Sequence, residues 1–132
     1  MTQNEKDILL KDLCGRLPYR VKVQIKNEIV VLDSICDDDG YHFNFIGEDR
    51  EGVNIGNIKP YLFPLSSMAE EQKKEYDSII YHNIELHCER YYNVIDVDCY
   101  EELHDFYHKN HLDYRNLIGK GLAIDATGLN IY

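Results

Sequence analysis

The sequence contains no tryptophan, only three prolines, and no long apolar run among its 132 residues. No stretch approaches the roughly 20 apolar residues of a membrane span, so we expect no membrane role. The four cysteines are far apart and form no C-x-x-C pair, and residues 2–7 are polar where a secretory signal would be apolar. These absences predict a reduced, cytoplasmic protein.

Positive charge is also scarce, because 14 Lys and Arg face 24 Asp and Glu, giving a formal net charge of −10. A nucleic-acid-binding protein gains affinity by replacing phosphate counterions with its own cations, so nucleic acid is an unlikely ligand. The charge favours a soluble protein, or one that binds a basic partner. Eleven tyrosines suit positions between core and solvent, and they suit interfaces equally.

The length fits a single domain, residues 1–132. Thr2 and Glu5 form a capping box that starts a helix over residues 2–13, which Gly15 ends. Alternating apolar residues and the Asp39-Gly40 turn then predict a series of short strands. These cover residues 20–26, 28–36, 41–46, a short segment around Val53 and Ile55, and 58–65.

The segment from Ile58 to Glu71 divides the chain into a β-rich part and a helical part. Pro60 and Pro64 favour extended backbone, and Ser67 with Glu70 forms a second capping box. Helices are predicted from residue 69 to about 82 and from 99 to about 110. The latter begins with a box of Asp98 and Glu101 and has an inward face of Tyr100, Leu103, Phe106 and Tyr107.

Residues 84–88 fit a strand by alternation, although Tyr76, Ile80, Ile84 and Cys88 also fit one helical stripe; we favour the strand. The resulting class is α+β. It comprises an N-terminal helix, a small antiparallel sheet or SH3-like barrel, and two or three further helices.

His104 and His108 are the weak metal candidates, because histidines four residues apart share a helix face, as in H-E-x-x-H zinc sites. Asp105 stands where that motif has Glu. His111 is about 10 Å from His104 along a helix axis, too far for both to bind one ion. A solvated helix flank is the favoured interpretation.

Asp37, Asp38 and Asp39 precede Gly40 as in a calcium loop, but Ile35 and Ile46 occupy the positions of the first and last acidic ligands. A polar hairpin tip is therefore favoured, and these carboxylates are candidates for binding a basic partner. One group of basic residues could instead bind nucleic acid, namely Arg16, Arg20, Lys22 and Lys26. The net negative charge of the chain argues against this interpretation.

No catalytic constellation is evident in the sequence. Gly47 and Gly52 have P-loop spacing without the Lys and Ser/Thr that follow in that motif, and no G-x-S-x-G is present. Paired acids are common in any acidic protein and do not indicate acid–base catalysis by themselves. We therefore expect no cofactor and consider a non-enzyme more probable than an enzyme.

Three segments carry a family resemblance: Lys11 to Tyr19 (K-D-L-C-G-R-L-P-Y), Ile58 to Met68 (beginning I-K-P-Y-L), and His111 to Ala123. Together they resemble a family of small uncharacterised proteins found in gut bacteria and their phages or mobile elements. The resemblance implies no activity, cofactor or catalytic residue.

Asp113, Tyr114 and Arg115 have both a structural and a functional interpretation. Asp113 can cap the next turn, Tyr114 can pack beneath a helix and Arg115 can pair with a carboxylate. Alternatively, Tyr114 and Arg115 form a partner-binding patch.

We expect a non-catalytic interaction protein of the inhibitor, immunity or host-modulating type. The alternatives are a metal-dependent enzyme using His104, Asp105 and His108, and a nucleic-acid-binding protein; a homo-oligomer is left open.

Overall fold

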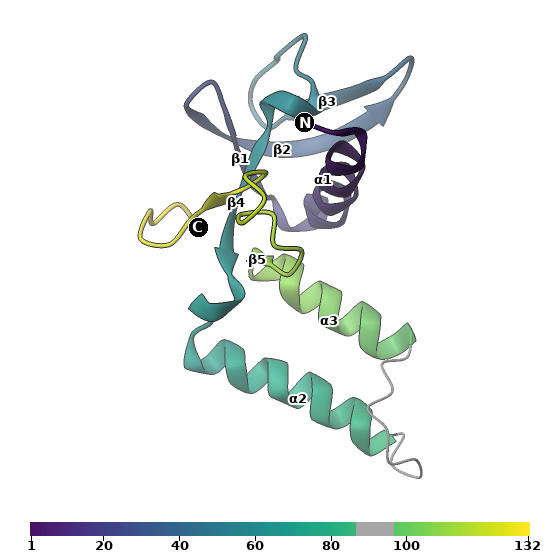
Figure 1. Ribbon diagram of the computed structural model, residues 1–132, viewed down its shortest axis with the longest axis vertical. Helices are drawn as coiled ribbons and strands as arrows, with labels where there is room; N and C mark the ends of the chain where they lie inside the picture. Colours follow the sequence, from purple (N-terminus) through teal and green to yellow (C-terminus); the bar gives the residue numbers. More distant parts are fainter. Residues whose placement is uncertain (87–96) are drawn as a thin grey trace.

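The computed structural model describes the backbone of residues 1–86 and 97–132 and the side chains of residues 1–80 and 100–132. A sheet with one helix across it forms the body of the molecule. Two further helices extend from the body as an arm (Figure 1). The predicted α+β class, with a helix before the sheet and helices after it, is confirmed.

Helix α1 (Gln3–Arg16) begins with the predicted capping box. The Thr2 hydroxyl accepts from Glu5 N at 3.1 Å, and the Glu5 carboxylate accepts from Thr2 N at 2.9 Å. The expected end at Gly15 is wrong, because the helix continues to Arg16 and then tightens into a 3₁₀ turn, η1 (Leu17–Tyr19). Gly15 instead allows His108 to approach, since a Cβ there would lie 2.6 Å from His108 Cε1.

Four strands pair in antiparallel fashion as predicted: β1 (Lys22–Ile25), β2 (Glu28–Asp37), β3 (Tyr41–Phe45) and β4 (Lys59–Pro64). Two short strands that the sequence did not indicate, β5 (Leu112–Asp113) and β6 (Ile124–Asp125), pair with β4 in parallel. The sheet is therefore mixed, with the order β3-β2-β1-β4-β5 and β6 also on β4.

Two local predictions between β3 and the second helix are wrong. Val53 and Ile55 do not start a strand; Ile55–Asn57 is a 3₁₀ turn (η2). Ser67 and Glu70 do not form a capping box, since Ser67 Oγ donates to the Pro64 carbonyl at 2.7 Å within a further 3₁₀ turn, η3 (Leu65–Ser67). The helix starts after Ala69, whose N–H donates to the Gln72 side chain at 2.8 Å.

Helix α2 (Glu70–Leu86) overturns the strand predicted from Ile84, as far as Leu86. The helical spacing of Tyr76, Ile80 and Ile84 prevails over the alternation, and Cys88 lies outside the described residues. Helix α3 (Val97–Lys109) confirms the predicted helix, although the side chain of Asp98, its expected cap, is not described. Tyr100, expected to point inward, is 51% exposed.

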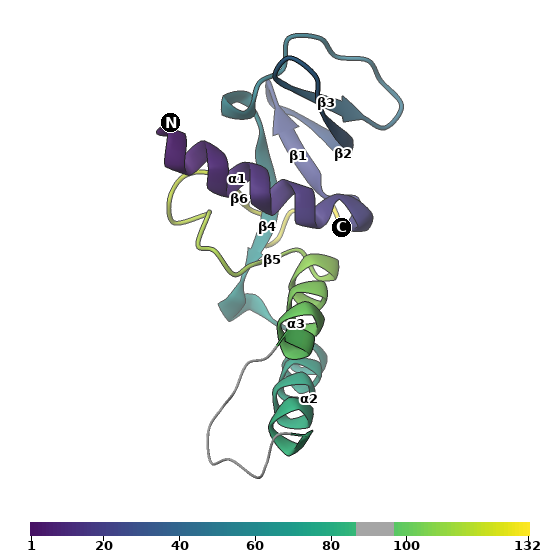
Figure 2. The same ribbon diagram turned by 90° about the vertical axis from the view of Figure 1, so that its right-hand side faces the viewer.

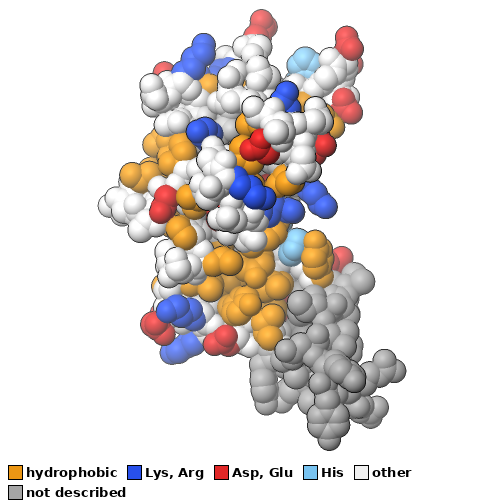
Figure 3. All heavy atoms as spheres, viewed as in Figure 1, with side chains coloured by type: hydrophobic (Ala, Val, Ile, Leu, Met, Phe, Trp, Pro, Cys, Tyr) orange, Lys and Arg blue, Asp and Glu red, His pale blue; other side chains and the backbone are white. Residues whose placement is uncertain are grey.

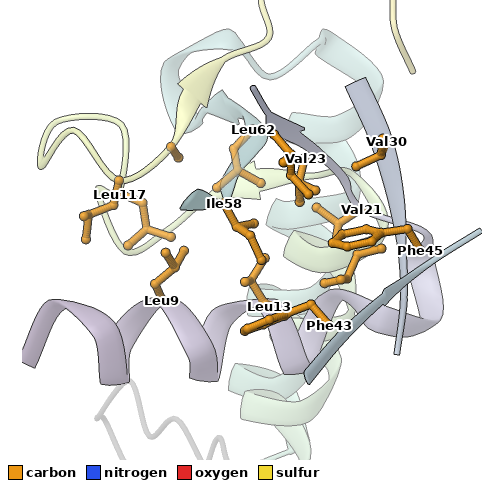
Figure 4. Packing of buried hydrophobic residues seen from close by; sticks show 14 residues of the cluster. Leu9, Leu13, Val21, Val23, Val30, Phe43, Phe45, Ile58, Leu62 and Leu117 are labelled. Atoms are coloured by element: carbon orange, nitrogen blue, oxygen red, sulfur yellow. The ribbon is translucent and has the colours of Figure 1, made fainter. Parts of the chain in front are cut away.

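The main core lies between α1 and the sheet (Figures 2 and 4). Leu9 and Leu13 of α1 pack against side chains from the sheet and from the C-terminal segment, namely Val21, Val23, Phe43, Phe45, Leu62 and Leu117. A second cluster joins the arm helices to β5 through Ile79, Leu103, Phe106 and Leu112. None of the described helices is long and apolar enough to cross a membrane.

Candidate binding site

The predicted acidic residues Asp37, Asp38 and Asp39 lie at the tip of the β2–β3 hairpin, and all three are exposed. Asp39 and Gly40 both have positive φ, 51° and 104°, as a tight hairpin turn requires. The Asp38 carbonyl accepts from His42 Nε2 at 2.8 Å, which fixes the imidazole beside the turn. These three carboxylates therefore project from a well-defined turn into solvent.

A cleft of about 390 Å³ follows this tip along β3. One wall is β3 itself, through His42, Phe43 and Asn44, and the other is the loop from Arg50 to Val53. Arg50 holds the loop in place by pairing with Glu48 at 2.8 Å and with Glu28 of β2. The sequence predicts a charged loop here, but no pattern in it indicates that the loop lies beside β3.

Tyr114 and Arg115, the other predicted binding residues, lie elsewhere, where α1 meets α3. Arg115 Nε donates to Asp12 Oδ1 at 3.3 Å, and its guanidinium lies 4.9 Å from the centre of the Tyr114 ring. Tyr114 stacks on Tyr107 of α3, with ring centres 4.8 Å apart and planes 13° apart. These are the structural roles that the sequence allows for both residues.

Asp113 also has its predicted structural role. Its two carboxylate oxygens accept from Leu117 N at 2.8 Å and from Ile118 N at 2.9 Å. Asp113 is only 7% exposed, so most of its carboxylate is used within the fold. The turn after β5 is thereby fixed against the core.

A buried ion pair underlies this junction. Arg16 Nε donates to Asp12 Oδ2 at 2.7 Å, and Arg16 Nη2 donates to the Leu112 carbonyl at 2.6 Å. Neither side chain has solvent exposure. Residues 11–19 and residues 111–123 thus meet through Arg16.

The weak metal candidates lie in the same region, on α3. His108 Nε2 is 2.9 Å from the Tyr114 hydroxyl, and Asp105 accepts from the Tyr19 hydroxyl at 3.3 Å. Burial, with the nearby Arg16 charge, lowers the pKa of His108 to about 4, so the imidazole is neutral at pH 7. Within the described residues, no group of three His, Cys, Asp or Glu side chains could hold a metal ion.

The four basic residues considered as a possible nucleic-acid-binding face, Arg16, Arg20, Lys22 and Lys26, do not form one surface. Arg16 is fully buried on Asp12, which removes it from any surface. The Lys22 ammonium donates to the Ile131 carbonyl and lies 5.6 Å from the centre of the Tyr132 ring. Arg20 and Lys26 remain exposed.

No family model, no curated protein and no solved structure matches this chain.

Proposed function

We propose that this protein is a non-catalytic binding protein whose acidic surface binds a basic protein partner, in the manner of an inhibitor, immunity or host-modulating protein. The single observation that carries the proposal is the distribution of the net charge of −10 along the fold. A protein with such a field attracts cationic partners and repels nucleic acid.

Two segments hold the excess of negative charge. Residues 37–51, which include the hairpin tip and the loop beside β3, contain six acidic residues and one arginine. Residues 70–109, which include α2 and α3, contain eleven acidic and four basic residues. The rest of the chain contains seven acidic and nine basic residues, so its charge is nearly balanced.

Acidic side chains are visible at the upper right of Figure 3, where Figure 1 places the tip of the β2–β3 hairpin. Within the described residues, the carboxylates of this tip form no ion pair or side-chain hydrogen bond that holds the fold together, unlike those of Asp12 and Asp113. Exposed acids without structural partners are available to a partner at little cost in stability.

Affinity capture followed by a binding measurement tests the proposal. The tagged protein is used to capture proteins from a lysate of its native host, and each captured protein is purified and titrated with the untagged chain. We expect a saturable, stoichiometric complex with a protein of high isoelectric point. Complexes with acidic proteins alone, or none that survive purification, would contradict the proposal.

A further inference from the structure

The outer edge of β3 is an unpaired sheet edge. In the sheet order β3 is terminal, and in the part of the chain that the structure describes its outer side has one isolated bridge, between Phe45 and Glu48. Ile46 N donates inward to the Val31 carbonyl at 3.0 Å. Backbone groups alternate along a strand, so those of Tyr41 and Phe43 point outward.

The residues of this edge strand lack the side chains by which proteins usually prevent strand addition. Natural edge strands carry lysine, proline or an inward-pointing charge, or they are covered by other chain segments. The five residues of β3, Tyr-His-Phe-Asn-Phe, include no lysine, no proline and no acid. At the other end of the sheet, β5 and β6 are only two residues long each.

The space beside this edge has room for a further segment. The cleft of about 390 Å³ opens between His42, Phe43 and Asn44 on one side and residues 50–53 on the other. An exposed aromatic side chain, Tyr41, stands at the start of the strand and is 51% exposed. Strand addition uses main-chain hydrogen bonds for affinity and side-chain sites for specificity, and this edge offers both.

The negative charge around the cleft favours a positively charged segment as its ligand. Asp37, Asp38 and Asp39 lie at one end, and Glu48, Asp49 and Glu51 belong to the loop that forms the opposite wall. Residues 37–51 contain one cation, Arg50, which is already paired with Glu28 and Glu48, and the exposed Lys26 lies beside the same loop. A second copy of this chain would bring two such acidic sets together, so like charges oppose edge-to-edge dimerisation.

We propose that the outer edge of β3 takes up an extended, basic segment of the protein partner as an additional strand, an inference that rests on the function proposed above. The backbone groups of Tyr41 and Phe43 pair with the segment. Its lysine or arginine side chains lie beside the carboxylates of Asp38 and Glu51. The proposal thus assigns the predicted acidic residues of the hairpin tip to one defined docking site.

The test uses an acetylated hexapeptide of alternating arginine and valine as the probe, with the isotope-labelled full chain observed by NMR. We expect shifts at Tyr41, Phe43 and Glu51 and slower amide exchange at Phe43. An arginine–proline hexapeptide carries the same charge but cannot pair along a strand, so it should bind more weakly. A glutamate–valine hexapeptide should not bind.

Two double variants with the same net charge distinguish binding at the cleft from general attraction by the net negative charge of the protein. Asp38→Lys with Glu51→Lys should weaken binding of the arginine–valine peptide by about tenfold, because both lysines flank the cleft. Glu71→Lys with Asp77→Lys, both exposed on α2, should change it by no more than about twofold.

The proposal would be overturned by equal weakening in both variants, by equally tight binding of the arginine–proline peptide, or by shifts confined to α2 and α3. In each case a basic captured partner could still bind through general electrostatics, so the function proposed above would stand. A concentration-dependent dimer that the peptide dissociates would assign the edge to a second copy and would likewise overturn it. Failure of both peptide and captured partner would refute both proposals.

Discussion

Asp12 and Arg16, one turn apart on α1, form an ion pair that is fully shielded from solvent, with Arg16 Nε 2.7 Å from Asp12 Oδ2. The same guanidinium donates to the Leu112 carbonyl of β5, and Asp12 also accepts from Arg115. The pair therefore links the N-terminal helix to the segment that follows the helical arm.

Removing Asp12 should destabilise the protein strongly. Asp12→Ala leaves the Arg16 charge buried without its carboxylate, and breaking such a pair costs about 3–5 kcal/mol of unfolding free energy. Urea denaturation monitored by circular dichroism measures the change in the free energy of unfolding. Asp7→Ala on the exposed side of the same helix serves as the control and should change stability by less than about 0.5 kcal/mol. A similar small effect for Asp12→Ala would show that the pair does not stabilise the fold.

Gly15→Ala should also destabilise the protein, although alanine is the better helix former by about 1 kcal/mol. A Cβ at this position would meet His108 Cε1 at 2.6 Å, and overpacking of this kind costs about 1–3 kcal/mol. The same substitution in a His108→Ala background should instead be neutral or stabilising, because the clash is gone. Thermal denaturation of the wild type, the two single variants and the double variant gives the coupling free energy between positions 15 and 108. Stabilisation by Gly15→Ala alone would contradict this packing.

Acid should destabilise the fold through buried histidines. Burial and the Arg16 charge lower the pKa values of His108 and His111 from 6.5 to about 4. Well above pH 6.5 both imidazoles are neutral in the folded and in the unfolded state, so the free energy of unfolding is not reduced by their protonation. As the pH falls toward 4, only the unfolded state binds the protons, so the free energy of unfolding decreases.

The pH dependence of urea denaturation between these limits tests this linkage. His108→Gln removes one titrating group and should flatten the decrease. An unaltered slope in His108→Gln would show that His108 does not carry the effect.

Local patterns predicted much of the fold correctly. The capping box of Thr2 and Glu5, the alternation in β1 and the Asp39-Gly40 turn are set by neighbouring residues, and the structure has each of them. The extended segment with Pro60 and Pro64 also forms β4 as expected. Such features depend on a few consecutive residues, so a single sequence suffices to find them.

Features that depend on distant partners were missed. Gly15 looks like a helix end until His108 is placed against it. β5 and β6 are two residues each and exist because β4 offers them a parallel edge. Arg16 looks like part of a basic surface until Asp12 and Leu112 surround it. The proposed docking site shows the same division. The sequence pointed to Asp37, Asp38 and Asp39, whose role in binding stays a prediction, but it did not indicate the cleft beside β3.

The most direct test of the acidic-surface account is the salt dependence of the complex with the captured partner. Isothermal titration at increasing sodium chloride, from about 50 mM to about 500 mM, shortens the Debye length from roughly 14 Å to roughly 4 Å and screens exposed charges. If the acidic surface binds the partner, the dissociation constant rises steadily across this range, and it rises less steeply for the Asp38→Lys, Glu51→Lys variant. A dissociation constant that stays the same from low to high salt would contradict the acidic-surface account.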